Sequence, residues 1–164
     1  MPAYRSELRA SDAEAVERLV AATGFFNAEE TGIARELVDE TLQRGAASGY
    51  QFLFAEREGH LDGYTCFGRI PGTQSNWDLY WIVVDPACQG QGLGRRLLQA
   101  SEQAVRAQGG DSVWIETSSR PQYAPTRALY LACGYALAAQ FEDFYAPGDA
   151  KCMYRRRLTT NKNQ

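Results

Sequence analysis

The hydrophobic positions of the chain repeat with two different periods, and these periods predict helices and strands in a defined order. Apolar residues at helical spacing, with start and stop signals, predict four helices. They cover residues 11–24, 30–45, 92–108 and 125–134. Short runs rich in aliphatic and aromatic residues predict strands. They cover residues 3–9, 50–56, 61–70, 77–85, 112–117, 135–144 and 151–158.

This order of elements predicts the fold class. About seven strands interrupted by helices are typical of an α/β protein with a mixed central sheet and helices on both faces. The sequence contains no repeat and no linker-like segment, so we expect a single domain over residues 1–158 and a disordered tail over residues 159–164. Ser11 and Glu14 have the spacing of a capping box at the start of the first helix.

Composition and charge narrow the classes of function. The 17 basic and 20 acidic residues leave a net charge of −3, too small to bind a polyanion by counterion release, so nucleic acid is not an expected partner. The start of the chain lacks the apolar segment of a signal peptide, and no apolar run reaches the roughly 18 residues that span a bilayer. We therefore expect a cytoplasmic protein with no membrane partner. The four cysteines are widely separated and the single histidine, His60, lies in a polar turn, so no metal site is expected.

Three glycines in five residues precede the predicted helix 92–108. The segment reads V-V-D-P-A-C-Q-G-Q-G-L-G-R-R over residues 83–96. Backbone N–H groups without Cβ obstruction at a helix N-terminus form an anion cradle, which Arg95 or Arg96 would reinforce, and a pyrophosphate is its natural ligand. The P-loop pattern is absent, and a dinucleotide fingerprint would follow the first strand of a β-α-β unit, whereas these glycines follow several strands. The alternative is a glycine-rich turn before a surface helix.

Two segments together resemble one known family. Q-G-Q-G-L-G, residues 89–94, resembles the Q/R-x-x-G-x-G/A motif of the GNAT N-acetyltransferase superfamily, and T-R-A-L-Y-L-A-C-G-Y, residues 126–135, resembles its A-x-x-L-Y-x-x-x-G-F segment. The motifs occur in the family's order, and the resemblance covers nearly the whole chain. It implies acetyl-CoA as co-substrate. It places the pyrophosphate on Gln89, Gly90, Gln91, Gly92, Leu93, Gly94 and Arg95, and the pantetheine arm on Ile82, Val83 and Val84.

The resemblance also gives a role to Tyr130. In many members the matching tyrosine lies beside the CoA sulfur, and a phenol with a pKa of about 10 can give a proton to the leaving thiolate. The alternative is that Tyr130 only packs under its helix. The family often has asparagine seven residues earlier, where this chain has Tyr123. Tyr123 and the hydroxyl of Thr126 are therefore the candidates for that cofactor contact.

An amine acceptor must lose a proton before it attacks, because an ammonium with a pKa of about 10.4 is not nucleophilic. Asp78 lies eleven residues before Gln89, the spacing at which histone-acetylating members of the superfamily carry a catalytic glutamate. It shares strand parity with Tyr80, Ile82 and Val84, which predicts that it points to the face where CoA and substrate meet. We expect it to act as general base through a water; the alternative is a polar residue that touches only solvent.

Other residues are candidates for the acceptor site. Glu116 ends a strongly apolar strand and is either a second candidate base or a substrate anchor. Asp143 and Tyr145 belong to the late strand that borders the acceptor pocket in this family, which implies an acidic, aromatic pocket for a cation. Phe25 and Phe26 either cover that pocket or belong to the core.

These observations predict an enzyme that transfers acetyl from acetyl-CoA directly to a primary amine of a small molecule or amino acid. One alternative is a protein N-terminal or lysine acetyltransferase, and another is a catalytically silent acyl-CoA-binding module. Cys88 raises a further alternative, a ping-pong mechanism, although it precedes the glycines on the phosphate side. A homodimer is possible, since dimers are common in the family.

Overall fold

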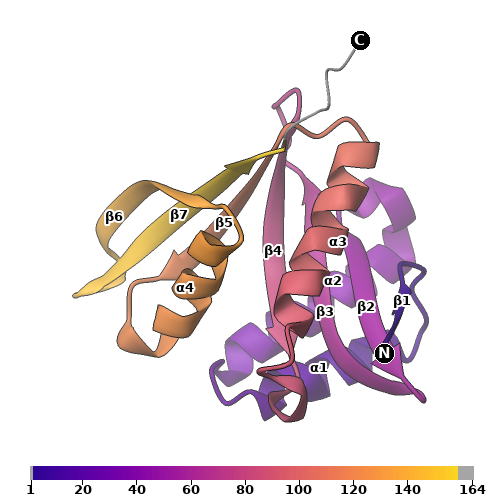
Figure 1. Cartoon of the computed structure of the whole chain (residues 1–164). Helices are drawn as coiled ribbons and strands as arrows, with labels where there is room; N and C mark the ends of the chain where they lie inside the picture. Colours follow the sequence, from indigo (N-terminus) through magenta and orange to yellow (C-terminus); the bar gives the residue numbers. More distant parts are fainter. Residues whose placement is uncertain (1, 159–164) are drawn as a thin grey trace. The chain divides into compact units, whose positions relative to one another are not determined.

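The computed structural model of the chain describes residues 2–158, so the predicted disordered tail lies outside the described residues. Seven strands form one hydrogen-bonded sheet in the order β1-β2-β3-β4-β5-β7-β6 (Figure 1). They are β1 (Ala3–Arg5), β2 (Gln51–Arg57), β3 (His60–Arg69), β4 (Asn76–Val84), β5 (Ser112–Ser118), β6 (Ala136–Ala146) and β7 (Asp149–Arg157). The helices are α1 (Asp12–Ala22), α2 (Ala28–Arg44), α3 (Leu93–Ala107) and α4 (Ala124–Ala132). β4 and β5 are parallel, whereas β5 and β7 are antiparallel. The predicted mixed α/β sheet is therefore confirmed.

The described chain divides into two compact units. The first contains residues 2–68 and 81–101, and the second contains residues 69–80 and 102–158. Both β4 and α3 contribute residues to each unit. A single domain over the whole chain stays a prediction, and the two units are described separately below.

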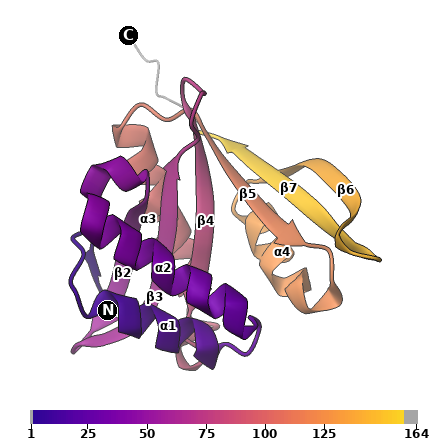
Figure 2. The ribbon, with the colours of Figure 1, turned by 180° about the vertical axis from the view of Figure 1, so that it is seen from behind.

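The core of the first unit lies on both faces of its strands. Phe52 and Phe54 of β2 and Tyr64 of β3 point to one face, where they pack with buried residues of α1 and α2. Figure 2 shows these two helices crossing that face. Ala55, with the opposite parity, packs with Leu97 of α3 on the other face. Helices therefore cover both faces in this unit, as the sequence predicted.

The start of α1 differs from the prediction. Ser11 precedes the helix with φ −71° and ψ −13°, a helical conformation, and its side chain makes no capping hydrogen bond. The predicted capping box with Glu14 is therefore wrong. Instead Arg5 donates to both carboxylate oxygens of buried Asp12 at 2.9 and 2.8 Å, and the Arg9 N–H donates at 2.6 Å. These bonds draw the chain toward α1, and β1 ends at Arg5 instead of residue 9.

The second unit places α4 and the end of α3 on the face of the sheet that carries Tyr154. Tyr130 of α4 packs against Tyr135 and Tyr154, with ring centroids 6.1 and 5.8 Å apart. Glu102 of α3 accepts hydrogen bonds from Arg156 of β7 at 2.7 Å. This ion pair joins α3 to the strand beside which Tyr130 lies.

Gly110, which follows α3, allows a close approach between Val105 of that helix and Trp77 of β4. A Cβ at Gly110 would lie 2.2 Å from a Val105 methyl carbon and 2.8 Å from the Trp77 ring. We expect Gly110→Ala to lower the free energy of unfolding by about 2–4 kcal/mol, because two buried side chains must shift. Gly32→Ala is the matched control: its Cβ meets nothing within 4 Å inside α2, and we expect a gain of about 0.5–1 kcal/mol. Urea unfolding of both variants measures the difference, and equal stabilities would contradict the packing argument.

Candidate functional site

The glycine segment forms a tight connection between β4 and α3. After Val84, the carboxylate of Asp85 accepts a hydrogen bond from the Ala87 N–H at 2.8 Å and caps a short 3-10 turn. Gly90 and Gly92 then both have φ +76°, a conformation that favours glycine because other residues are strained there. Helix α3 begins directly afterwards, and the first N–H groups of a helix have no intrahelical acceptor. The predicted anion cradle therefore has the required backbone.

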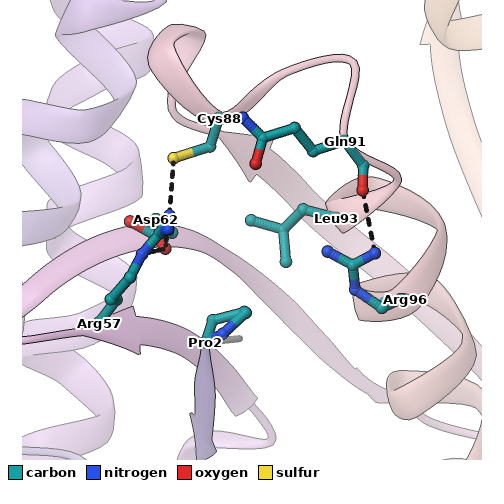
Figure 3. Close-up of a pocket in the computed structure, with 7 residues that line it drawn as sticks. All are labelled: Pro2, Arg57, Asp62, Cys88, Gln91, Leu93 and Arg96. Carbon is teal, nitrogen blue, oxygen red and sulfur yellow. Dashed lines mark hydrogen bonds and ion pairs between the residues drawn. The ribbon is translucent and has the colours of Figure 1, made fainter.

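The two arginines that follow the glycines have different surroundings. Arg95 is exposed. Arg96 turns back and donates from Nη1 to the carbonyl oxygen of Gln91 at 2.9 Å, as Figure 3 shows. Its Nε is buried and has no hydrogen-bond partner among the described residues. Arg96 thus stabilises the glycine segment through its hydrogen bond to Gln91, whereas Arg95 remains accessible to an anion.

A cavity of about 230 Å³ lies behind the glycine segment in the first unit (Figure 3). Arg57 lines it, with 2.8 Å from Nη2 to the Asp62 carboxylate and 3.8 Å from Nη2 to the Cys88 sulfur. Cys88 is 7% exposed, and burial raises the pKa of its thiol. Because the thiolate is the nucleophilic form, this environment disfavours the ping-pong alternative.

The end of β4 was expected to pair with the pantetheine arm. Val83 is buried in the core with α1 and α2, whereas Ile82 and Val84 are half-buried. The side-chain amide of Gln89 donates to the Val84 carbonyl oxygen at 3.4 Å. This contact ties the first residue of the glycine motif to the strand before it, and pairing with a ligand stays a prediction.

The two ends of β4 belong to different units. In the second unit, Trp77 borders Gly110, which follows α3. In the first unit, Val84 packs with a cluster that contains Leu97 of α3. That Asp78 points to the same face as Ile82 and Val84 stays a prediction.

Asp78 and Glu116 belong to one charged cluster of the second unit. Asp78 pairs in register with Trp114 of β5, and Glu116 lies two residues further along β5 on the same side. Burial, reinforced by the charge of Glu116, raises the pKa of Asp78 to about 6, against the opposing effect of Lys151. The structure thus brings the two predicted carboxylates into electrostatic contact.

Lys151 is the member of this cluster that the sequence analysis missed. Its Nζ lies 3.3 Å from Oε1 of Glu116 and 4.6 Å from the centroid of the Phe144 ring. The side chain of Lys151 is 17% exposed and that of Glu116 is 45% exposed. In the sequence, Lys151 alternates with Cys152, which is buried, and this pattern indicates that Lys151 lies on the other face of the strand. Its contact with Glu116 could not be predicted, because it depends on strand register.

The other predicted acceptor residues do not all belong to this cluster. Burial raises the pKa of Tyr145 to about 12, and Glu116 is among the charges that contribute. Asp143 instead has φ +54° in the irregular part of β6 and accepts the Gly148 N–H of the β6–β7 turn at 2.7 Å. Tyr80 is exposed and lies on the same strand segment as Asp78.

Tyr130 is 3% exposed, and burial raises the pKa of its phenol. The phenol therefore stays protonated at neutral pH. Tyr123 directly precedes α4, where the guanidinium of Arg120 lies 5.7 Å from its ring centroid. Thr126 is half-buried in the first turn of the same helix. Their proposed contacts with the cofactor stay predictions.

Phe26 and His60 contact other side chains of the first unit, whereas Phe25 is exposed. Phe26 packs against Trp81 with a centroid distance of 5.0 Å in the first core, while Phe25 is 43% exposed. His60 begins β3, and its Nε2 lies 2.9 Å from an Asp85 carboxylate oxygen.

Within residues 2–158, no cluster of three or more His, Cys, Asp or Glu side chains could hold a metal ion. Among the same residues, no helix is long and apolar enough to cross a membrane.

Comparisons with known proteins agree with the motifs. The model of the acetyltransferase (GNAT) family matches residues 19–135, so the chain belongs to this family. The chain is 29% identical over 126 residues to a mycothiol acetyltransferase of Sanguibacter keddieii, an alignment that covers 74% of this chain and spans only 38% of that relative's length. The predicted family is therefore confirmed.

Solved structures agree with the fold. A GNAT-family protein from Desulfovibrio desulfuricans superimposes with a TM-score of 0.96 at 44% identity, covering 97% of this chain and 100% of the other. An aminoglycoside 6'-N-acetyltransferase in complex with coenzyme A superimposes with a TM-score of 0.76 at 14% identity, covering 98% and 99%. The second likeness shows the fold alone.

Proposed function

We propose that the protein transfers the acetyl group of acetyl-CoA directly to a primary amine of a small molecule or amino acid. The observation that carries the proposal is the pair of positive-φ glycines before α3 in a chain of the GNAT family. A Cβ at Gly90 would meet nothing within 4 Å, so the backbone there is open to a ligand. A solved relative of the same fold is described with coenzyme A.

The glycine segment would hold the cofactor through its pyrophosphate. The N–H groups at the start of α3 and the exposed Arg95 supply positive charge, and Arg96 keeps the segment in place through Gln91. Ile82 to Val84 offer backbone groups to the pantetheine arm. When bound, acetyl-CoA supplies an activated thioester carbonyl. The chain's own residues then need only to orient the two substrates and move protons.

Asp78 is the proposed general base. The acceptor enters as an ammonium, and Asp78 accepts one of its protons, directly or through a water. The amine nitrogen then forms the new C–N bond while the C–S bond breaks, and Tyr130 donates a proton to the departing sulfur. The second proton that the nitrogen loses returns through solvent to the Tyr130 oxygen. A carboxyl with a pKa of about 6 is closer to an amine pKa than an ordinary carboxyl is, so the proton transfer is less unfavourable.

The test of this proposal is release of CoA from acetyl-CoA, measured with a thiol reagent across amino acids, polyamines, aminoglycosides and short peptides. We expect one class of small amine to accelerate release. Acceleration by peptides alone would support a protein acetyltransferase instead. Binding of acetyl-CoA without acceleration by any amine would support the silent binding module.

Two predictions from the sequence remain part of this proposal. They are a cytoplasmic location and a homodimer, and dimers are common in the family. β6 lies at the edge of the sheet order and exposes Leu137 and Phe141, which is compatible with association through this strand. Sedimentation of the purified protein measures the oligomeric state.

Gly92→Ala tests the cradle separately from the chemistry. The substitution forces alanine into φ +76° and places its Cβ 3.3 Å from Nη1 of Arg96. We expect the Kd of acetyl-CoA to rise about 10-fold, because the strain of roughly 1–2 kcal/mol is relieved by moving the segment. Gly72→Ala imposes the same strain at φ +79° with nothing within 4 Å, and calorimetry should show unchanged binding. If both variants bind acetyl-CoA like the wild type, the segment is not the cradle.

A further inference from the structure

The charged cluster of the second unit contains charges of both signs. Asp78 and Glu116 provide two carboxylates, and the Lys151 ammonium is held between Glu116 at 3.3 Å and the Phe144 ring at 4.6 Å. Arg155 on the same strand as Lys151 lies over the Trp114 ring at 5.3 Å. This cluster therefore has the charges to bind an ammonium and an anion together.

The Glu116–Lys151 pair limits which acceptors can bind without leaving a charge unpaired. An acceptor ammonium that pairs with Glu116 competes with Lys151 for the same carboxylate. Lys151 is only 17% exposed, so solvent replaces its lost partner poorly, and a buried unpaired charge is strongly disfavoured. A simple amine therefore binds at the expense of Lys151.

An acceptor with its own carboxylate removes this conflict. In an α-amino acid the nitrogen and a carboxylate oxygen are separated by three bonds, and standard bond lengths place them about 3 Å apart. That spacing is close to the 3.3 Å between Lys151 and Glu116. The two zwitterionic pairs can lie head to tail, so that each charge faces an opposite charge. A carboxylate several bonds further from the amine does not match this spacing.

We infer that the acceptor is an α-amino acid or a close analogue, whose ammonium binds Glu116 and Asp78 and whose carboxylate binds Lys151. This inference rests on the proposed function and names the substrate class of the same site. Lys151 thereby determines specificity, because it favours acceptors with a carboxylate next to the amine and disfavours those without one.

The experiment compares kcat/KM for three matched acceptors: an α-amino acid, its α-amide and its decarboxylated amine. We expect the wild type to favour the amino acid at least 10-fold over the other two. Lys151→Met keeps an apolar chain over Phe144 but loses the charge. We expect it to lower kcat/KM for the amino acid at least 10-fold and, because the competing ammonium is gone, to raise the value for the simple amine. Arg157→Met, at the exposed end of the same strand, is the control and should leave the wild-type preference unchanged.

Each other outcome has a distinct meaning. If the wild type acetylates the amide, the amine or peptide N-termini as well as the amino acid, the inference is overturned while the proposed function stands. If Lys151→Met lowers all three values equally, Lys151 is only structural and the inference is again overturned. If no amine accelerates CoA release by the wild type, the proposed function itself fails.

Discussion

Asp78→Asn lowers kcat/KM for the acceptor amine by about 10²–10⁴-fold, the usual contribution of a positioned general base. The amide has nearly the same shape but cannot accept the proton. Steady-state kinetics with the best acceptor of the panel measures the effect, and acetyl-CoA binding should be unchanged. An Asp78→Asn variant with wild-type turnover would assign Asp78 to the solvent-exposed alternative and leave Glu116 as the candidate base.

The pH dependence of kcat/KM tests the same assignment of Asp78 as general base. Because the pKa of Asp78 is raised to about 6, kcat/KM should fall as the pH decreases through about 6, where the base becomes protonated. Lys151 lowers this pKa and Glu116 raises it. Lys151→Met should therefore move the inflection to higher pH, and Glu116→Gln should move it to lower pH. If both variants moved the inflection in the same direction, this electrostatic explanation would be contradicted.

The raised pKa also predicts an effect on stability. A carboxyl whose pKa is higher in the folded than in the unfolded protein binds more protons when folded, so its ionisation destabilises the fold as the pH rises from about 4 through about 6. Asp78→Asn should consequently be more stable than the wild type above pH 7, by about 1–3 kcal/mol, and the difference should vanish near pH 3.5. Thermal unfolding at both pH values measures it. A residue that touches only solvent would show no such difference.

Tyr130→Phe lowers kcat by about 10²-fold if Tyr130 protonates the leaving thiolate. Its ring is buried against Tyr154, and removing one hydroxyl keeps that packing. Tyr154→Phe removes the same atom from the neighbouring ring and is the matched control, with kcat expected within about 3-fold of wild type. Equal losses in the two variants would show that only the aromatic cluster matters.

The succession of elements was predictable because it depends on local patterns. The periods of apolar residues placed the helices and strands within a few residues, and the glycines located the turn before α3. Features that depend on long-range side-chain contacts could not be predicted from the sequence. Arg5 reaches Asp12 and ends β1 early, and this contact has no signal in the local sequence.

The candidate site was predictable to a similar extent. Asp78 and Glu116 were found from spacing and polarity, and the structure places them in one electrostatic cluster. Lys151 was missed because its contact with Glu116 depends on the register of β5 and β7. Asp143 was chosen for its charge, but it has a positive φ in the irregular part of β6 and its carboxylate accepts the Gly148 N–H. The distinct positions of Arg95 and Arg96 likewise depend on loop geometry.

The central claim is transfer of an acetyl group to an amine nitrogen. The most direct measurement incubates the protein with isotope-labelled acetyl-CoA and the acceptor, and follows the label by mass spectrometry. We predict that the label appears on the nitrogen of the acceptor, in amounts equal to the CoA released. Label that appears only as free acetate, or that stays on acetyl-CoA with every acceptor, would contradict the claim.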